Sequence, residues 1–176
     1  MATLPIRHYD DPILRTKAKP IESITPEIIQ LAQDMIETMI FANGVGLAAP
    51  QIGQLLRIFV IRDEKHIQGD EYQLGPAEVM INPILSNFSK EKDSMLEGCL
   101  SLPGLHVDVS RPVCINIRYQ NLKGEWIEEK AKNFRARVMM HENDHLDGLM
   151  TIQRISKVEQ KKIQSELLAI KKRYHP

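Results

Sequence analysis

The pentapeptide His141-Glu142-Asn143-Asp144-His145 constrains this chain more than any other stretch of its sequence. If the stretch is helical, residues four apart share a face, so both imidazole rings can bind one metal ion. Glu142 would then lie beside the ion without binding it, where its carboxylate can take a proton from a water molecule held there. The pentapeptide therefore predicts a helical metal site suited to hydrolysis.

The flanking residues favour a helix from Phe134 to Asp147. Phe134 and Val138 fall on the same stripe as the two histidines, and Gly148 follows at a position where glycine commonly ends a helix. The ligand face of this helix must be buried. On the pentapeptide alone, a helix that merely carries two surface histidines remains an alternative.

Two histidines are only part of a hydrolytic metal site, which needs three protein ligands and one open position. Conventional zinc peptidases place the third ligand after the histidines, but the residues that follow Gly148 offer no acid or histidine at that spacing. Upstream, Cys99 lies in the stretch E-G-C-L-S-L-P, which we expect to be a loop, and a thiolate is a strong ligand for zinc or ferrous iron. Cys114 alternates with polar residues in a strand-like run, so we interpret it as a small buried side chain.

A glycine-rich segment, Gly44 to Gly53, joins a strong helical pattern to a strand-like run. Gly44 and Gly46 flank Val45 and would let a substrate backbone come close. Gln51 stands out because its side-chain amide can donate a hydrogen bond to an oxyanion. The segment lacks the lysine of a phosphate-binding loop, and taken alone it is most simply a turn.

The segments G-V-G-L-A-A-P-Q, E-G-C-L-S-L-P and H-E-N-D-H-L resemble, in order and spacing, the three signature motifs of peptide deformylase. The resemblance spans essentially the whole chain. It implies that one divalent metal ion, typically Fe²⁺ with Zn²⁺, Ni²⁺ or Co²⁺ able to substitute, is bound by Cys99, His141 and His145. It also implies that Glu142 is the general acid and base, and that Gln51 and the backbone N–H of Leu100 stabilise the oxyanion.

The same resemblance implies the reaction. The family removes the formyl group from the N-terminal methionine of new polypeptides and releases formate, so we expect N-formyl-methionyl peptides as substrates. Two positions depart from the family pattern. Met140 stands where many relatives have glutamine, which should change packing and leave coordination unaltered. His106 stands where several relatives place an arginine near the substrate, which leaves open how the downstream residues of the peptide are held.

The methionine side chain of such a substrate needs an apolar slot. Val138 and Phe134 lie one and two turns, respectively, before the first histidine on its helical face, and we expect them to line this slot together with Val45. Arg137 is an odd neighbour for an apolar slot, and we expect its guanidinium to extend outward. The peptide itself is expected to add as a strand along the backbone from Gly44 to Gly46.

The remaining patterns predict one α+β domain over residues 1–176, with antiparallel sheets around the central metal-binding helix and a helix near each end. The first helix has Thr25 as its N-cap and Pro26 at its first position, and it runs to Asn43. The last helix opens at a capping box on Ser156 and runs to Arg173, with apolar residues from Val158 to Ile170 packed on the body. Strand-like runs occupy residues 57–62 and 78–82, and a hairpin pairs 113–120 with 125–132. Residues 64–76 are polar and are expected to form a flexible loop.

Composition favours a cytoplasmic enzyme. The chain has 176 residues, 43% of them hydrophobic, and its 23 basic and 23 acidic residues give a net charge of zero. No global field therefore attracts DNA or a membrane surface. Two cysteines give no disulfide framework, the N-terminus has no signal-peptide core, and no apolar run is long enough to span a membrane.

One alternative from another functional class is a catalytically silent relative that keeps the metal as a clamp and binds peptides or ribosomes. The loss of Glu142 or Gln51 would point to it, and both are present. A basic cluster in the last helix is most simply a solvated face, but it also suits docking on the ribosome: Lys161, Lys162, Lys171, Lys172 and Arg173.

Overall fold

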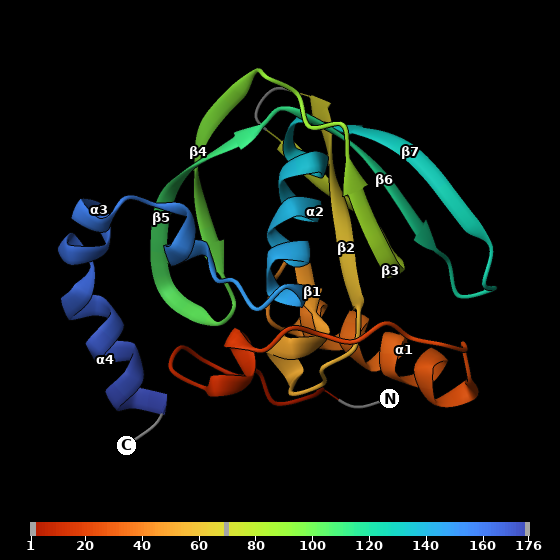
Figure 1. Cartoon of the computed structure of the whole chain (residues 1–176), viewed down its shortest axis with the longest axis horizontal. Helices are drawn as coiled ribbons and strands as arrows, with labels where there is room; N and C mark the ends of the chain where they lie inside the picture. Colours follow the sequence, from red (N-terminus) through yellow and green to blue (C-terminus); the bar gives the residue numbers. More distant parts are fainter. Residues whose placement is uncertain (1–2, 69–70, 175–176) are drawn as a thin grey trace.

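The helix that carries the metal motif lies between two antiparallel sheets (Figure 1). The computed structural model describes residues 3–68 and 71–174. Helix α2 (Asn133–Leu146) is central, α1 (Pro26–Phe41) lies below the larger sheet, and the C-terminal helices lie outside the smaller one. The predicted α+β class, with antiparallel sheets around a metal-binding helix, is confirmed.

The larger sheet has five strands in the order β1-β2-β3-β6-β7, and every neighbouring pair is antiparallel. The predicted strand runs and the hairpin before α2 are confirmed, although most boundaries shift by a residue or more. Gly124 has φ of 80° in the hairpin turn, a conformation that glycine adopts without strain. The strands are β1 (Gly46–Ala48), β2 (Ile58–Gln68), β3 (Glu71–Ser86), β6 (Cys114–Gln120) and β7 (Trp126–Lys132).

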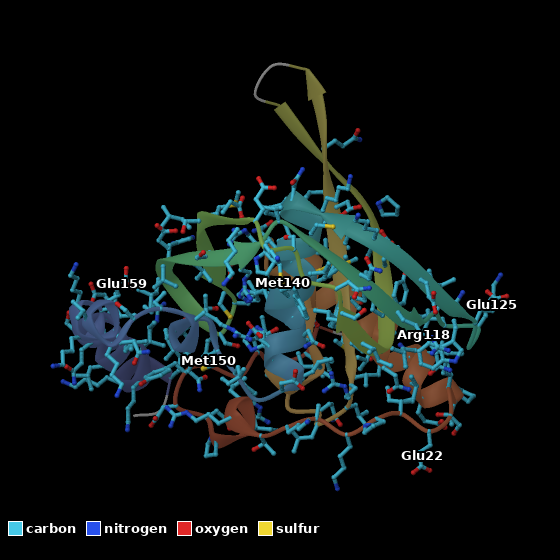
Figure 2. All side chains as sticks on the ribbon, turned by 45° about the horizontal axis from the view of Figure 1, so that its top comes forward. Glu22, Arg118, Glu125, Met140, Met150 and Glu159 are labelled. Atoms are coloured by element: carbon cyan, nitrogen blue, oxygen red, sulfur yellow. The ribbon has the colours of Figure 1, made fainter. Side chains whose placement is uncertain are left out.

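Strands β2 and β3 extend together away from the body as a long ribbon (Figure 2). The expectation of a flexible loop over residues 64–76 is therefore wrong, although positions 69–70 lie outside the described residues. Backbone pairing continues to Gln68 opposite Glu71, which satisfies the polar backbone groups that a loop would leave to water. Gly75 and Pro76 sit at a register shift, where a residue without an N–H is tolerated.

The smaller sheet consists of β4 (Lys92–Cys99) and β5 (Leu102–Pro112). Cys99 was expected in a loop, but it is the last residue of β4 and immediately precedes the turn at Leu100 and Ser101. The strand was not predicted because its only buried residue is the charged Glu97. Apolar alternation, the usual signal of a half-buried strand, is therefore missing from β4.

Helix α1 begins as predicted, with Pro26 at its first position and Glu27 in its first turn. It ends at Phe41, two residues before the predicted end at Asn43. Asn43 has φ of 54°, outside the helical range, and the N–H of Gly44 closes the end by donating to the Met39 carbonyl over 2.8 Å. This ending directs the glycine segment into β1 and toward α2.

Helix α2 occupies the predicted position, starting and ending one residue earlier than expected. Gly148 follows its C-cap with φ of 72°. A Cβ atom on Gly148 would lie 2.8 Å from the carbonyl of Arg15, so the N-terminal segment packs directly on this turn. Nearby, the N–H of Ala18 donates to the Leu146 carbonyl over 2.8 Å.

The predicted C-terminal helix is divided into α3 (Lys157–Lys162) and α4 (Gln164–Tyr174). Its capping box is confirmed, because the Ser156 hydroxyl accepts from the Glu159 N–H and the Glu159 carboxylate accepts from the Ser156 N–H. The change of direction at Ile163 leaves Val158 66% exposed, while Leu167 and Ile170 are buried near β5. The expected apolar stripe is thus wrong at Val158 and confirmed in α4.

None of the helices in the described ranges is long and apolar enough to cross a membrane.

Two glycines with positive φ provide a matched test of the packing below α2. Gly104 has φ of 78° and open space around its Cβ position, whereas Gly148 has backbone in that position. Alanine at 104 should cost only the left-handed strain of about 1–2 kcal/mol. Gly148→Ala should lower the free energy of unfolding by clearly more, as measured by urea denaturation. Equal losses for the two variants would contradict the close packing of the Arg15 backbone against Gly148.

Candidate metal centre and substrate cleft

Three side chains with metal-binding atoms meet between β4 and α2: Cys99, His141 and His145. Their ligand atoms all lie within 4.8 Å of one another, and Cys99 Sγ is 3.3 Å from His145 Nε2. One sulfur and two imidazole nitrogens at this spacing can surround a single ion and leave a fourth position open. The donor set fits a divalent transition metal such as zinc or iron. The structure therefore contains the predicted Cys-His-His metal site.

The charges in this site favour the ligating form of the cysteine. Burial alone would raise the pKa of the Cys99 thiol, but the rings of His145 and His141 lower it well below its usual value. Burial would likewise lower the pKa of His141, whereas Cys99 and Glu97 raise it well above its usual value. A thiolate is the form that binds metal, and a proton on the His141 ring would leave as an ion enters.

Glu97 orients His141, a role that the sequence analysis missed. Its Oε2 atom is 3.0 Å from His141 Nδ1, which leaves the Nε2 atom free for the metal. Burial alone would raise the pKa of Glu97, but hydrogen bonds with His141 and Arg111 outweigh this effect and lower it to about 2. The available signal was that Glu97 precedes Cys99 by two residues, so the two share a face if the stretch is a strand.

Glu142 lies next to the ligand set with one oxygen unused. Its Oε2 atom is buried and has no hydrogen-bond partner among the residues described. Burial raises the pKa of Glu142 to about 7, so the group can both take and return a proton near neutral pH. Gly46 makes room for it, since a Cβ there would lie 2.2 Å from Glu142 Oε1. A buried carboxylate oxygen without a partner fits a site that receives water or substrate.

Gln51 is held with its amino group toward the metal site. It lies in the 3₁₀ turn Ala49–Ile52, where its Oε1 atom accepts from the Ala48 N–H over 2.8 Å. The Nε2 atom consequently donates toward Ser101 Oγ at 3.2 Å and Cys99 Sγ at 3.6 Å. The side chain is 1% exposed, so this orientation is fixed by the fold. The amide is therefore placed to donate a hydrogen bond next to the ligand set.

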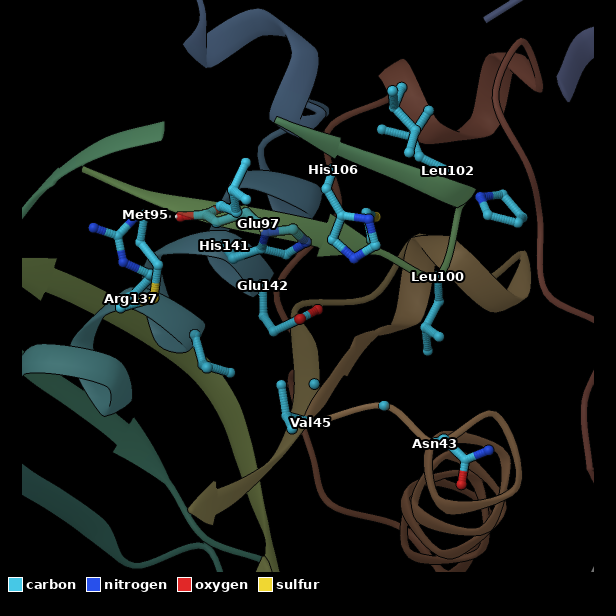
Figure 3. Close-up of a pocket in the computed structure, with 18 of the residues that line it drawn as sticks. Asn43, Val45, Met95, Glu97, Leu100, Leu102, His106, Arg137, His141 and Glu142 are labelled. Carbon is cyan, nitrogen blue, oxygen red and sulfur yellow. Dashed lines mark hydrogen bonds and ion pairs between the residues drawn. The ribbon is translucent and has the colours of Figure 1, made fainter. Parts of the chain in front are cut away.

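A cavity of about 450 Å³ opens beside the metal ligands (Figure 3). One wall comes from the glycine segment before β1, another from β4 and the turn into β5, and the floor from α2. Its lining includes the five residues that were expected to bind substrate, Gly44, Val45, Gly46, Phe134 and Val138. It also includes the two expected oxyanion donors, Gln51 and Leu100, together with Met95, Leu96, Leu102, Leu105 and His106.

Arg137 also lines the cavity, but it does not extend outward as expected. It is 4% exposed, and its guanidinium donates to Glu97 Oε1 at 2.7 Å, the Val109 carbonyl at 2.7 Å and Asp93 Oδ1 at 2.5 Å. The expectation was wrong because acceptors on β4 and β5 offset the buried charge. Those partners are distant in sequence and could not be read from the helix alone.

The two positions that depart from the family pattern differ in their relation to the cleft. Met140 is buried in the core and does not line the cavity (Figure 2). His106 is exposed at the cleft, directly opposite Gly98 in the strand register. Its Nε2 atom lies 2.9 Å from where a Cβ on Gly98 would be, so the ring covers that glycine.

This chain is similar to known proteins along nearly its whole length. A family model described as polypeptide deformylase matches residues 3–161. A peptide deformylase of Dictyoglomus thermophilum is 47% identical over 149 residues, covering 85% of this chain and 90% of that protein. The structure of peptide deformylase from Ehrlichia chaffeensis in complex with actinonin is 34% identical, with a TM-score of 0.89 and 100% of both chains covered. A class I type b peptide deformylase from Acinetobacter baumannii, whose crystal structure has Met-Ala-Ser bound, is 34% identical and has a TM-score of 0.81. The match covers 87% of this chain and 98% of that chain.

The two cysteines allow the ligand assignment to be tested directly. Cys99→Ala should lose the bound metal because it removes the sulfur from the ligand set. Cys114→Ala is the matched control, since Cys114 is also a free, half-buried cysteine but lies on β6. Metal content per chain, measured after identical purification, should fall only for Cys99→Ala. Full metal content in that variant would contradict the assignment of Cys99 as a ligand.

Proposed function

We propose a mechanism for this chain from the premise that it belongs to the peptide deformylase family. The protein is a metal-dependent hydrolase that removes the formyl group from N-terminal formyl-methionine and releases formate. The observation that carries the proposed mechanism is the position of Glu142, whose buried, unpartnered oxygen lies next to the Cys-His-His site. A catalytically silent relative that used the metal only as a clamp would not need this buried, unpartnered carboxylate oxygen.

Cys99, His141 and His145 would hold one divalent ion, which we propose is Fe²⁺ in the cell. Support comes from the sulfur and imidazole donors, which also accept Zn²⁺, Ni²⁺ or Co²⁺. When bound, the ion supplies Lewis acidity that acidifies water and polarises the formyl oxygen. Metal analysis of protein purified without oxygen distinguishes these ions.

Glu142 would act as the general base and then as the general acid. Its carboxylate takes a proton from the attacking water and returns it to the amine that leaves as the C–N bond breaks. A pKa raised to about 7 by burial suits both steps, because neither protonation state is strongly disfavoured at neutral pH. The absence of Cβ at Gly46 lets the carboxylate occupy this position.

Gln51 and Leu100 would stabilise the charge that develops on the formyl oxygen. The Gln51 amide is already turned toward Cys99 by its hydrogen bond to the Ala48 N–H, so little reorganisation is needed when the charge forms. The second donor would be the backbone N–H of Leu100, the residue after Cys99 at the end of β4.

The substrate would bind as an extended peptide in the cleft. Strands β1 and β4 each pair with one neighbour in the described sheets, β2 and β5 respectively, so each has a free edge where a peptide can add. The methionine side chain would enter the part of the cleft lined by Val45, Phe134 and Val138. A relative with Met-Ala-Ser bound supports a peptide of this kind.

Replacing Glu142 by glutamine separates catalysis from metal binding. Glu142→Gln should keep its metal, because Glu142 is not a ligand. It should lose turnover by about 10²-fold or more, since the amide cannot accept the proton. The assay is formate release from a short formyl-Met peptide, with metal content measured on the same sample. A metal-loaded variant that keeps a tenth or more of the wild-type kcat would refute the role of Glu142.

We also propose that the basic C-terminal region docks on the ribosome, where new polypeptides emerge, which would place the protein in the cytoplasm. Lys161, Lys162 and Lys172 are exposed and free to meet phosphate. Lys171 is also exposed, but its Nζ atom is 2.7 Å from Asp10 Oδ2 and ties α4 to the N-terminal segment. A test of docking must therefore leave Lys171 unchanged.

Charge reversal to glutamate at Lys161, Lys162 and Lys172 should weaken co-sedimentation with ribosomes and reduce its salt dependence, because fewer counterions are released on binding. Hydrolysis of a short formyl-Met peptide should stay at the wild-type rate. The control is the same reversal at Lys123, Lys130 and Lys132, which are exposed on the β6–β7 hairpin, on the opposite side of the molecule (Figure 1). If the C-terminal variant co-sediments as well as the control, the docking proposal fails.

A further inference from the structure

The buried guanidinium of Arg111 on β5 binds carboxylates on both elements of the metal centre, Glu97 on β4 and Asp144 on α2. Its Nε and one terminal nitrogen donate to the two oxygens of Glu97 at 2.6 and 2.9 Å. Its other terminal nitrogen donates to Asp144 Oδ2 at 2.9 Å. Arg111 is 4% exposed, so these bonds are shielded from water.

The Glu97 contact controls two of the three ligands. Glu97 Oε2 is 3.0 Å from His141 Nδ1, so the position of this carboxylate sets the orientation of the ring. Glu97 also lies two residues before Cys99 on the same strand. Holding Glu97 therefore fixes both the His141 ring and the end of β4 that presents the sulfur.

The Asp144 contact controls the third ligand. Asp144 immediately precedes His145 on α2 and is also bound by Arg154, from the 3₁₀ turn Thr151–Arg154. His145 Nδ1 is buried and has no hydrogen-bond partner within residues 3–68 and 71–174. Unlike His141, this ring has no carboxylate of its own, so its placement depends on how firmly the helix around Asp144 is held.

We propose that Arg111 is a positioning residue that holds Cys99, His141 and His145 in ligating geometry. The task requires a planar cation with donors in two directions, because Glu97 and Asp144 approach it from different elements. Lysine keeps the charge but cannot reproduce the two-pronged contact with Glu97. This inference rests on the metal site of the proposed function and is independent of its substrate.

The test compares Arg111→Lys with Arg135→Lys. Arg135 provides a matched control because it also lies among carboxylates, those of Asp63, Glu78 and Glu129, and anchors the first turn of α2. In the part of the chain that the structure describes, its hydrogen-bond and ion-pair partners include neither a metal ligand nor Glu97. Both variants should lower the melting temperature of the metal-free protein. Only Arg111→Lys should weaken Co²⁺ and Zn²⁺ binding, by about 10- to 100-fold in chelator competition. It should also change the visible absorption spectrum of the Co²⁺ form.

The outcomes separate positioning from general stability. A folded Arg111→Lys with wild-type affinity and Co²⁺ spectrum would overturn the proposal, and so would equal losses of affinity in both variants. If Arg111→Lys does not fold, Asp144→Asn replaces it, because this change weakens one side of the bridge while keeping the shape of the side chain. An unchanged Co²⁺ spectrum in that variant would then overturn the proposal. A wild-type protein that binds no Co²⁺ would instead refute the ligand set itself.

Discussion

The burial of a polar helix between two sheets is the constraint on which the rest of this structure depends. Helix α2 buries Arg137, His141, Glu142, Asp144 and His145, and charged groups can be buried only when partners offset the loss of water. The partners come from outside the helix: Glu97 from β4, Arg111 from β5 and Arg154 from the 3₁₀ turn that follows. The smaller sheet and the C-terminal turn are thus held to α2 through its buried side chains.

Glu142 differs from the other buried carboxylates because it lacks a cationic arginine partner among the described residues. This difference allows it to exchange a proton at the site. Glu97 and Asp144 are bound by arginines, and hydrogen bonds keep Glu97 ionised, with a pKa of about 2. Glu142 has no arginine partner among the described residues, and burial raises its pKa to about 7. Carboxylates on neighbouring elements thereby take different roles, one as a fixed anion that orients a ligand and one as a group that can exchange a proton.

The sequence predicted the features that depend on local spacing. The four-residue separation of His141 and His145, the cap at Gly148 and the capping box at Ser156 all have signals within one or two turns. It did not predict the partners of the buried charges, because Glu97 meets Arg111, Arg137 and His141 across 14, 40 and 44 residues of chain. The outward placement expected for Arg137 failed for that reason. Strand β4 was missed because nearly all its side chains are exposed, so it lacks apolar alternation. The β2–β3 ribbon was missed because it is held by backbone pairing, which a run of polar side chains does not reveal.

The metal site lies where the end of β4 meets α2, so its geometry depends on how these two elements are held together. Cys99 is at the last residue of β4, whereas both histidines are on α2, so any movement of the smaller sheet relative to the helix would change the distance between sulfur and nitrogen. In the described ranges, no strand of the two-stranded smaller sheet pairs with a strand of the larger sheet, so strand pairing does not fix that distance. Side chains must fix it, and buried charged groups are suited to this because their bonds are directional and a lost partner is costly. Residues of β1 and β4 also line the cleft, so the contacts that hold the metal ligands act on the strands that form its walls.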